Sequence, residues 1–258
     1  MNIKAKKSFG QHFLTSETIA ENIADALIKI DLYKNVLEVG PGKGFLTKYL
    51  ISRPFGLKVV EADRDMVDYL NTNYKVLQGR IISEDFLKVE MTQYFDNQPF
   101  GLIGNFPYNI SSQIVFKMIE NRHLIPEMVG MFQKEVAERI VSPPGSKEYG
   151  VISVLLQAFY EGKYLFTVDR SNFAPPPKVQ SGVIRLVRKE NQDLGCDYEL
   201  FRTVIKTSFG QRRKMLRNTV RGMINDDVFL ADEFFNKRPE VLSVEDFVWL
   251  TKQIESRR

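Results

Sequence analysis

The sequence predicts an α/β fold, a doubly wound and mostly parallel sheet, followed by a small all-helical C-terminal domain. Short apolar runs alternate with helical patterns over residues 35–132, as expected for βαβ units. The first run leads through a glycine-rich turn, residues 40–44, into a helical pattern, which is the nucleotide-binding opening of such folds. From residue 198 onward only helical patterns occur after a polar linker. We therefore expect domains at 1–188 and 189–258.

Composition limits the classes of function. The 258 residues carry a net charge of +4 and a pI near 9.0, which is mildly basic and fits a nucleic-acid partner. One cysteine, Cys196, excludes an internal disulfide and suits the reducing cytoplasm. With only His12 and His123 beside it, we expect no metal site. No apolar run is long enough to span a membrane, and no apolar segment follows the N-terminal lysines, so we expect no signal peptide.

The N-terminal region begins with a basic stretch, residues 4–10, which we expect to be a flexible arm. Thr15 or Ser16 then provides an N-cap, and apolar residues at helical spacing through Ile30 predict an amphipathic helix. His12, between the arm and this helix, is open to two interpretations. It is either a packed loop histidine or a residue that lies against a ligand at the mouth of the fold.

The predicted elements of the sheet follow in chain order. Residues 63–65 read as solvated caps of the helix after the second strand. The predicted parallel strands are 35–39, 57–60, 80–82, 100–103 and 129–132, and 165–168 with 183–187 forms a closing antiparallel hairpin. The predicted helices among them include 45–51, 111–120, 133–139 and 151–160.

Four polar residues each end one of the successive parallel strands, so they share one rim of the sheet. Glu38 precedes the Gly40–Gly42 turn, where it would repel a pyrophosphate but attract a cationic, amino-acid-bearing cofactor. Glu61 lies about 20 residues past the turn, where a ribose diol is usually held. Asp85 can accept from an adenine amine with Phe86 beside it, or it is a helix cap. Asn105 is the fourth.

The loop Asn105-Phe106-Pro107-Tyr108 follows the apolar strand at 100–103. Pro107 removes a backbone donor and holds Phe106 extended, so the Phe106 carbonyl and the Asn105 side-chain oxygen can point the same way. Two converging acceptors suit a planar NH2 group, and Tyr108 offers a flat face for a base. The alternative is an Asn-capped proline turn with two core aromatics.

Two further stretches are candidates for contacts with a nucleic acid. Phe173 opens a proline-rich loop and is either a second aromatic wall facing Tyr108 or a hydrophobic pin for that loop. After Gly210 we expect a helix that opens at Gln211 and carries a basic ridge, with RNA phosphates as the partners. The alternative is a solvated face. The residues of the ridge are Arg212, Arg213, Lys214, Arg217 and Arg221.

Three strand-end residues suit an adenosine-bearing cofactor and the fourth suits a target amine, which is the layout of an S-adenosylmethionine-dependent N-methyltransferase with a Rossmann-like fold. The sequence resembles the ribosomal RNA adenine-N6 dimethyltransferase family, and most closely its bacterial small-subunit members. Six motifs carry the resemblance in order over nearly the whole chain. They are Lys7–Leu14, Glu38–Gly42, Gly104–Ser111, Gln133–Val136, Phe173–Val179 and Phe209–Lys214.

The resemblance implies dimethylation of two adjacent adenines in the 3′-terminal hairpin of 16S rRNA, with a role in small-subunit assembly. Its cofactor contacts map onto His12, Leu14, Gly40, Glu61, Asp85 and Asn105. The family usually has Asn where this chain has His12, and Leu where it has Phe106. The alternatives are a large-subunit adenine methyltransferase of the macrolide-resistance type and a non-catalytic RNA-binding assembly factor. With no exposed apolar seam evident, we expect a cytoplasmic monomer.

Overall fold

The computed structural model describes Lys6 and residues 10–257; the rest of the predicted basic arm lies outside the described residues. The chain forms two compact units. The first consists of Met1–Glu138 and Glu161–Arg188, and the second of Arg139–Tyr160 and Lys189–Arg258. The units interleave along the chain, and our division at residue 188 stays a prediction.

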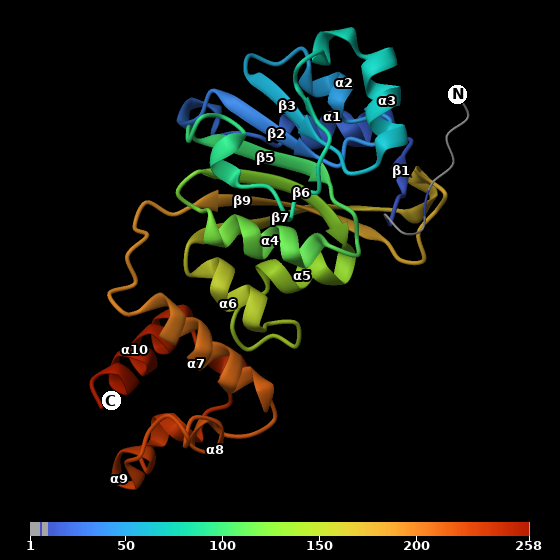
Figure 1. Cartoon of the computed structure of the whole chain (residues 1–258). Helices are drawn as coiled ribbons and strands as arrows, with labels where there is room; N and C mark the ends of the chain where they lie inside the picture. Colours follow the sequence, from blue (N-terminus) through green and yellow to red (C-terminus); the bar gives the residue numbers. More distant parts are fainter. Residues whose placement is uncertain (1–5, 7–9, 258) are drawn as a thin grey trace. The chain divides into compact units, whose positions relative to one another are not determined.

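The first unit is built on the sheet, which has seven strands in the order β4-β3-β2-β5-β6-β9-β7 (Figure 1). The five neighbouring strands β4, β3, β2, β5 and β6 pair in parallel, and β9 is antiparallel to β6. The strands are β2 (Asn35–Val39), β3 (Gly56–Val60), β4 (Ile81–Ile82), β5 (Phe100–Asn105), β6 (Glu127–Gln133), β7 (Tyr160–Val168) and β9 (Ser181–Arg188). This confirms the predicted α/β class with a mostly parallel sheet and an antiparallel end.

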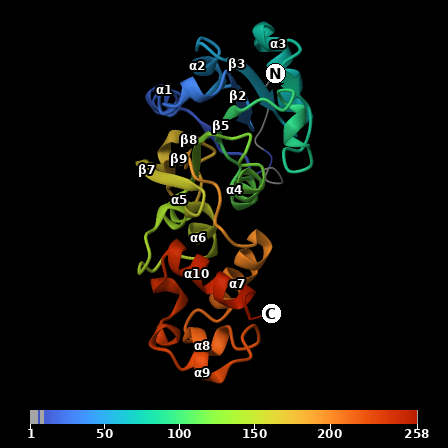
Figure 2. The same ribbon diagram turned by 90° about the vertical axis from the view of Figure 1, so that its left-hand side faces the viewer.

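Helices cover both faces of this sheet, and Figure 2 shows α1 and α2 on one side and α4 on the other. Side chains alternate along each strand, so Val36 of β2 joins the core beneath α1 while Leu37 faces the other layer. The helices are α1 (Glu17–Asp25), α2 (Thr47–Leu50), α3 (Arg64–Asn73), α4 (Ser111–Glu120) and α5 (Lys134–Val141).

Helix α1 is shorter than the pattern predicted. Ser16 is its N-cap, as one of the two candidates, but the helix ends at Asp25 rather than near Ile30. The buried carboxylate of Glu127 accepts hydrogen bonds from the backbone nitrogens of Ile28 and Lys29, at 3.0 and 2.9 Å. These tertiary bonds take backbone donors that a longer helix would need, so the periodic apolar pattern is overridden.

A short strand pair that the sequence did not predict ties the N-terminal segment to the proline-rich loop. β1 (Phe13–Leu14) is antiparallel to β8 (Phe173–Ala174), with Leu14 opposite Phe173. Residues far apart in the chain are thereby held side by side, next to the glycine turn.

The second unit is helical apart from the first residue of β7. It contains α6 (Val151–Gln157), α7 (Tyr198–Gly210), α8 (Leu216–Thr219), α9 (Asp227–Leu230) and α10 (Val244–Glu255). Ser243 and Asp246 form a capping box at the start of α10, and Phe247 and Leu250 of this helix are buried. None of the helices in the described part of the chain has the length and apolar character that a membrane span requires.

The prediction that a helix begins at Gln211 is wrong. Residues 211–214 form a turn in which the backbone nitrogen of Lys214 donates to the Gln211 carbonyl at 2.8 Å. The next helix, α8, starts only at Leu216, because Met215 is extended. The basic residues therefore do not form a continuous helical ridge.

A glycine pair makes room for the ring of Phe106. Gly104 of β5 lies opposite Gly130 of β6, and a Cβ at Gly130 would lie 2.3 Å from Phe106 Cε2. A Cβ at Gly104 would lie 2.8 Å from Phe106 Cε1. The ring is 1% exposed and packs edge-on against Phe132, at 5.1 Å between centroids. The two glycines thus fix the chain just beyond β5.

We predict that Gly130→Ala destabilises the protein by about 1–3 kcal/mol, because the added methyl overpacks the Phe106 ring against a sheet that cannot yield. Denaturant unfolding, followed by the shift in midpoint, measures the change. Gly222→Ala is the matched control, since no atom lies within 4 Å of a Cβ built there. Equal stability of Gly130→Ala and wild type would contradict the packing role.

Candidate functional site

A cavity of about 510 Å³ opens at the carboxyl ends of the parallel strands. It is bounded by the glycine turn, by the loop after β5 and by residues 10–15 of the N-terminal segment. The structure brings together there most of the residues that the sequence singled out. These are His12, Leu14, Glu38, Gly40, Gly42, Glu61, Asp85, Phe86, Asn105, Phe106, Pro107 and Tyr108.

The glycine turn approaches both neighbouring segments closely. Gly42 has a positive φ of 55°, and a Cβ there would lie 3.1 Å from the Phe13 ring. Gly40 also has a positive φ, of 68°, and a Cβ on it would come within 3.5 Å of Pro107. Only glycine adopts these angles without strain. The turn and the loop after β5 therefore lie almost in contact at one end of the cavity.

Glu38 is a buried acid with one carboxylate oxygen that lacks a partner in the described part of the chain. Its side chain lines the cavity, is 1% exposed, and its Oε2 has no hydrogen-bond partner within the described part of the chain. Burial raises the pKa of Glu38 to about 8, the Thr47 hydroxyl beside it opposes the shift, and the charge of Glu61 acts in the same direction as burial. A cation brought next to this carboxyl would stabilise its ionised form.

Glu61 is held in place by backbone donors. Its Oε2 accepts from the Gly42 nitrogen at 3.1 Å and its Oε1 from the Asp63 nitrogen at 2.9 Å. Burial raises the pKa of this carboxyl, although the backbone hydrogen bonds oppose the shift. Each oxygen keeps a second lone pair, so Glu61 can still accept from a ligand.

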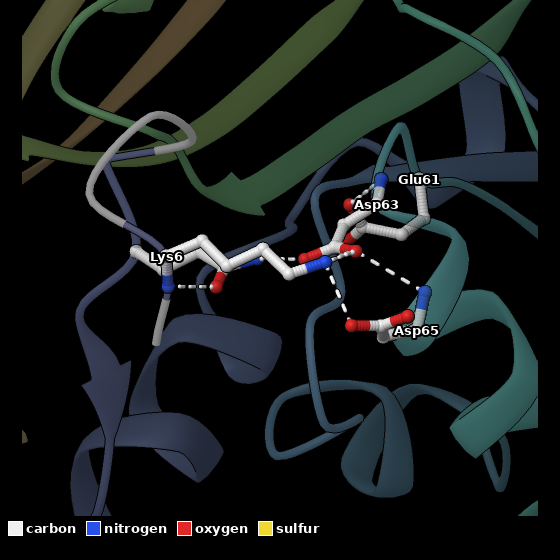
Figure 3. A network of polar contacts seen from close by, with 5 residues as sticks. Lys6, Glu61, Asp63 and Asp65 are labelled. Atoms are coloured by element: carbon white, nitrogen blue, oxygen red, sulfur yellow. Dashed lines mark hydrogen bonds and ion pairs between the residues drawn. The ribbon is translucent and has the colours of Figure 1, made fainter. Parts of the chain in front are cut away.

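Asp63 differs from the solvated cap that we expected. It does cap α3, since its Oδ1 accepts from the Asp65 nitrogen at 3.1 Å, but it is 1% exposed. The Lys6 ammonium lies 2.6 Å from it, and Gln11 donates to it at 2.9 Å (Figure 3). Burial would raise the pKa of Asp63, but the bonds from Lys6 and Gln11 prevail and lower it. Asp63 thus has its hydrogen-bonding partners within the protein and anchors the N-terminal segment through Lys6 and Gln11.

Asp85 lies in the loop after β4, and its two carboxylate oxygens have different neighbours. Its Oδ1 accepts from the Leu87 nitrogen at 3.0 Å, which caps a turn rather than a helix. Its other oxygen is 3.7 Å from the Lys88 ammonium. The side chain is 39% exposed and lines the cavity beside Phe86. The local capping role and a ligand-binding role are therefore compatible.

The loop after β5 is oriented by its side chains. Asn105 Nδ2 donates to the His12 carbonyl at 3.0 Å, so Oδ1 is the atom left to accept from a ligand. The Phe106 nitrogen donates to Met131 at 3.2 Å. Tyr108 is half-buried, its hydroxyl lies 2.5 Å from Ser181 Oγ, and burial raises the pKa of Tyr108.

His12 packs beside Tyr108, with ring centroids 5.4 Å apart and planes tilted by 32°. Its Nδ1 lies 2.9 Å from the Pro175 carbonyl. A carbonyl oxygen only accepts, so this bond assigns a proton to Nδ1 and orients the ring at the cavity wall. His12 is therefore a packed loop residue that also lines the cavity, and its contact with a ligand stays a prediction.

Phe173 corrects one expectation. Its ring is 3% exposed, belongs to the core beneath α1, and lies outside the cavity lining. The pairing of β8 with β1 places Phe173 opposite Leu14, and this packing draws the ring inward. In the structure Phe173 pins the proline-rich loop, and the ring beside Tyr108 is that of His12.

The five basic residues of the predicted ridge, all in the second unit, differ in their surroundings. Arg212 donates to the Ser146 carbonyl at 3.2 Å and lies 3.8 Å from Glu240. Arg217 donates to Asn236, and Arg221 pairs with Asp227 at 2.6 Å. Among the described residues, Arg213 and Lys214 are exposed cations for which no ion pair is found. These two are the ones available for phosphates.

Sequence reasoning missed three supporting residues. Gln11 and Ser181 lie inside or just after stretches already singled out, but neither was assigned a partner. Asp63 follows Glu61 by two residues at the same strand end, and that position was a signal for a role at the rim. Their partners are distant in the chain, so the sequence alone could not identify the bonds.

Comparison with known proteins gives a consistent result. Residues 2–245 match the family described as ribosomal RNA adenine dimethylase. Ribosomal RNA small subunit methyltransferase A of Flavobacterium johnsoniae is 56% identical over 254 residues, covering 98% of this chain and 97% of the relative. The protein of the same name from Bacteroides fragilis is 52% identical over 256 residues, covering 98% and 93%.

Two solved structures share the fold. A dimethyladenosine transferase from Plasmodium falciparum superposes with a TM-score of 0.79 at 24% identity, covering 95% of this chain and 98% of that one. The 23S rRNA methyltransferase ErmE gives a TM-score of 0.69 at 23% identity, with coverage of 94% and 99%. Both likenesses confirm the predicted fold class.

We predict that Glu38→Gln removes a pH dependence of stability. The pKa of Glu38 rises from 4.5 to about 8 in the folded protein, so the fold retains a proton that the unfolded chain releases above its own pKa. This stabilising contribution is complete below the unfolded pKa and is lost as the pH rises towards the folded one, with a limiting slope of about 1.4 kcal/mol per pH unit. Glutamine mimics the protonated acid and has no such loss.

Denaturant unfolding of both proteins between about pH 5 and pH 8 measures the effect. Wild type should lose stability relative to Glu38→Gln as the pH rises. Parallel curves over this range would show that the carboxyl is ionised in the fold.

Proposed function

The chain belongs to the ribosomal RNA adenine dimethylase family, and from this membership we propose that it dimethylates the N6 amine of two adjacent adenosines in the 3′-terminal hairpin of 16S rRNA. It is a methyltransferase of small-subunit ribosomal RNA. The observation that carries the site assignment is the single cavity shared by the glycine turn and the Asn105–Tyr108 loop. The proposed substrate implies a cytoplasmic enzyme with a role in subunit assembly.

The proposed methyl donor is S-adenosylmethionine, which when bound supplies an electrophilic methyl group on a sulfonium. The described residues fit this group. Glu38 is buried and its Oε2 has no partner among the described residues, so it suits the ammonium of the donor's amino-acid end. Glu61 retains lone pairs for the ribose hydroxyls. Asp85 can accept from the adenine amine, with Phe86 beside it.

The proposed target site is the loop after β5. Asn105 Oδ1 and the Phe106 carbonyl would each accept one N–H of the adenine amine, which raises the electron density on its nitrogen. Their fixed positions, set by the Asn105–His12 bond and the Phe106 packing, supply orientation rather than acid–base chemistry. No strong base is required, since the alkylated amine loses its proton easily.

Adenine must leave its stack to reach the loop, at a cost of a few kcal/mol. Tyr108 offers a face for stacking, worth about 1–3 kcal/mol per base. Because Ser181 holds the Tyr108 hydroxyl and His12 lies against its ring, we assign the bracing of this face to these two residues. Phe173 acts indirectly in this proposal, by pinning the loop that carries Pro175.

The RNA partner is the small ribosomal subunit. The helical unit carries the five basic residues of the predicted ridge, and of these five only Arg213 and Lys214 are exposed with no ion pair found in the described part of the chain. We propose that these two contact RNA phosphates. The relatives at 52–56% identity are named for the small subunit, which favours that substrate over the large-subunit alternative.

Asn105→Ala should lower the turnover number about 100-fold at saturating cofactor, because one preorganised acceptor for the target amine is lost. Tritium transfer from labelled S-adenosylmethionine to methyl-free small subunits measures the rate, and large subunits test the alternative substrate. Asn73→Ala is the matched control, since its Nδ2 also donates to a backbone carbonyl, that of Tyr69, at 2.8 Å on the surface. Near-normal turnover of Asn105→Ala would refute the assigned role.

Arg213→Ala should weaken binding to the small subunit and reduce the slope of log K against log salt by about one unit, the effect of one lost phosphate contact. Filter binding across a salt series gives the slope. Arg202→Ala serves as control, because Arg202 is paired with Glu199 at 3.5 Å in the same unit. If both variants keep the wild-type slope, Arg213 belongs to a solvated face.

A further inference from the structure

Lys117 of α4 makes contacts unusual for a surface lysine. Its ammonium donates to the Phe86 carbonyl at 2.7 Å and to the Val89 carbonyl at 2.5 Å. It also lies 5.4 Å from the centre of the Phe86 ring. Lysine is rarely held away from water unless it is paired, and here the partners are two backbone carbonyls of one loop.

That loop is the one that carries Asp85 and Phe86 at the cavity. Residues 83–90 contain neither helix nor strand; the Asp85 carbonyl accepts from the Lys88 nitrogen at 2.9 Å within the segment, but the Phe86 and Val89 carbonyls are bound by a side chain from outside it. On the inner side Asp85 caps the turn through the Leu87 nitrogen. On the outer side Lys117 reaches the carbonyls on both sides of that turn. The loop is therefore held between its own carboxylate and the ammonium from α4.

The Phe86 ring is also held in place by its neighbours. It is 3% exposed and stacks on Tyr94, with centroids 6.4 Å apart and planes 13° from parallel. The Lys117 ammonium and Tyr94 both contact this ring, so the side chain next to Asp85 has little freedom. Burial lowers the pKa of Lys117, while the charges of Glu90, Asp85 and Glu120 oppose this shift.

Helix α4 begins at Ser111, three residues after the target loop ends at Tyr108. Lys117 thus links the element that follows the proposed adenine-target loop to the loop that holds the proposed cofactor's adenine. A rigid tie of this kind matters where one acceptor must distinguish an amine from another group, because a small displacement weakens a directional hydrogen bond.

We propose that Lys117 is a positioning residue that holds the Asp85–Phe86 loop in the geometry that selects an adenine-bearing cofactor. This inference rests on the proposed function, since it assumes that Asp85 accepts from the cofactor's 6-amino group. Lys117 touches neither cofactor nor target in this role. It acts through the two carbonyls that it binds.

The experiment compares two ligands in calorimetric titrations, S-adenosylhomocysteine and S-inosylhomocysteine. The second carries an oxygen in place of the 6-amino group, so Asp85 would face another acceptor. In wild type we expect a preference for the adenosyl ligand of about 10- to 100-fold, the range for a hydrogen bond to a charged group. In Lys117→Met the adenosyl ligand should weaken about 10-fold and the inosyl ligand by no more than about 3-fold, so the preference for the adenosyl ligand falls by at least about 3-fold.

Lys189→Met is the matched control. The Lys189 ammonium also donates to a backbone carbonyl, that of Gln157, at 2.5 Å within the second unit. Neither residue lines the cavity, so this variant should keep the wild-type preference while losing a similar tie. Melting temperatures of the two variants show whether their losses of stability match.

Asp85→Ala separates the two levels of the inference. If wild type prefers the adenosyl ligand and Asp85→Ala does not, the cofactor assignment holds. Retention of the preference in Lys117→Met would then overturn the positioning role alone. If wild type shows no preference, the assignment of Asp85 fails and the role of Lys117 fails with it. Should Lys117→Met not fold, Lys117→Gln, which keeps one shorter donor, is expected to show an intermediate preference, and a wild-type preference there would overturn the proposal.

Discussion

The hydrogen bond from Asn105 Nδ2 to the His12 carbonyl is the interaction on which the site depends. An amide has a donor end and an acceptor end, and this bond uses one of the two N–H groups and so determines which end faces His12. The oxygen at the other end is then left to accept from a ligand. Because His12 is itself held at Pro175, the bond joins the N-terminal segment, the loop after β5 and the proline-rich loop. Three segments remote in sequence thus determine the orientation of one oxygen.

The backbone beside that oxygen is held by the packing of the Phe106 side chain. Gly104 and Gly130 lie opposite each other on β5 and β6 and leave room for the ring of Phe106. The family usually has Leu at this position, so the larger ring of Phe106 makes the clearance over the glycines more demanding. A backbone carbonyl acts regardless of its side chain, but its direction depends on where that side chain is allowed to pack. This explains how a substitution in the target loop can be compatible with its role.

The sequence predicted the sheet and the rim well, because alternating apolar runs and strand-end residues are local signals. Glu38, Glu61, Asp85 and Asn105 all reach one cavity as expected. Phe173 was misjudged because its place depends on the β1–β8 pairing, which no local pattern encodes. The predicted length of α1 was wrong for the same kind of reason, since tertiary bonds from Glu127 end the helix early. The helix predicted from Gln211 was wrong because residues 211–214 form a turn and Met215 is extended.

The three acids at the ends of β2 and β3 show how burial and partners sort residues that look alike in the sequence. Glu38, Glu61 and Asp63 are all nearly inaccessible, so burial alone would raise the pKa of each. Asp63 has Lys6 and Gln11, and its pKa falls. Glu61 has backbone donors and Glu38 Oε2 has no partner within the described residues, and the pKa of both is raised. An acid with a built-in cation stays ionised and serves the fold, whereas an acid without one relieves the cost of burial by keeping its proton. A cation beside Glu38 would favour its ionised form, which is the reason that we propose Glu38 as the contact for the cofactor's cationic end.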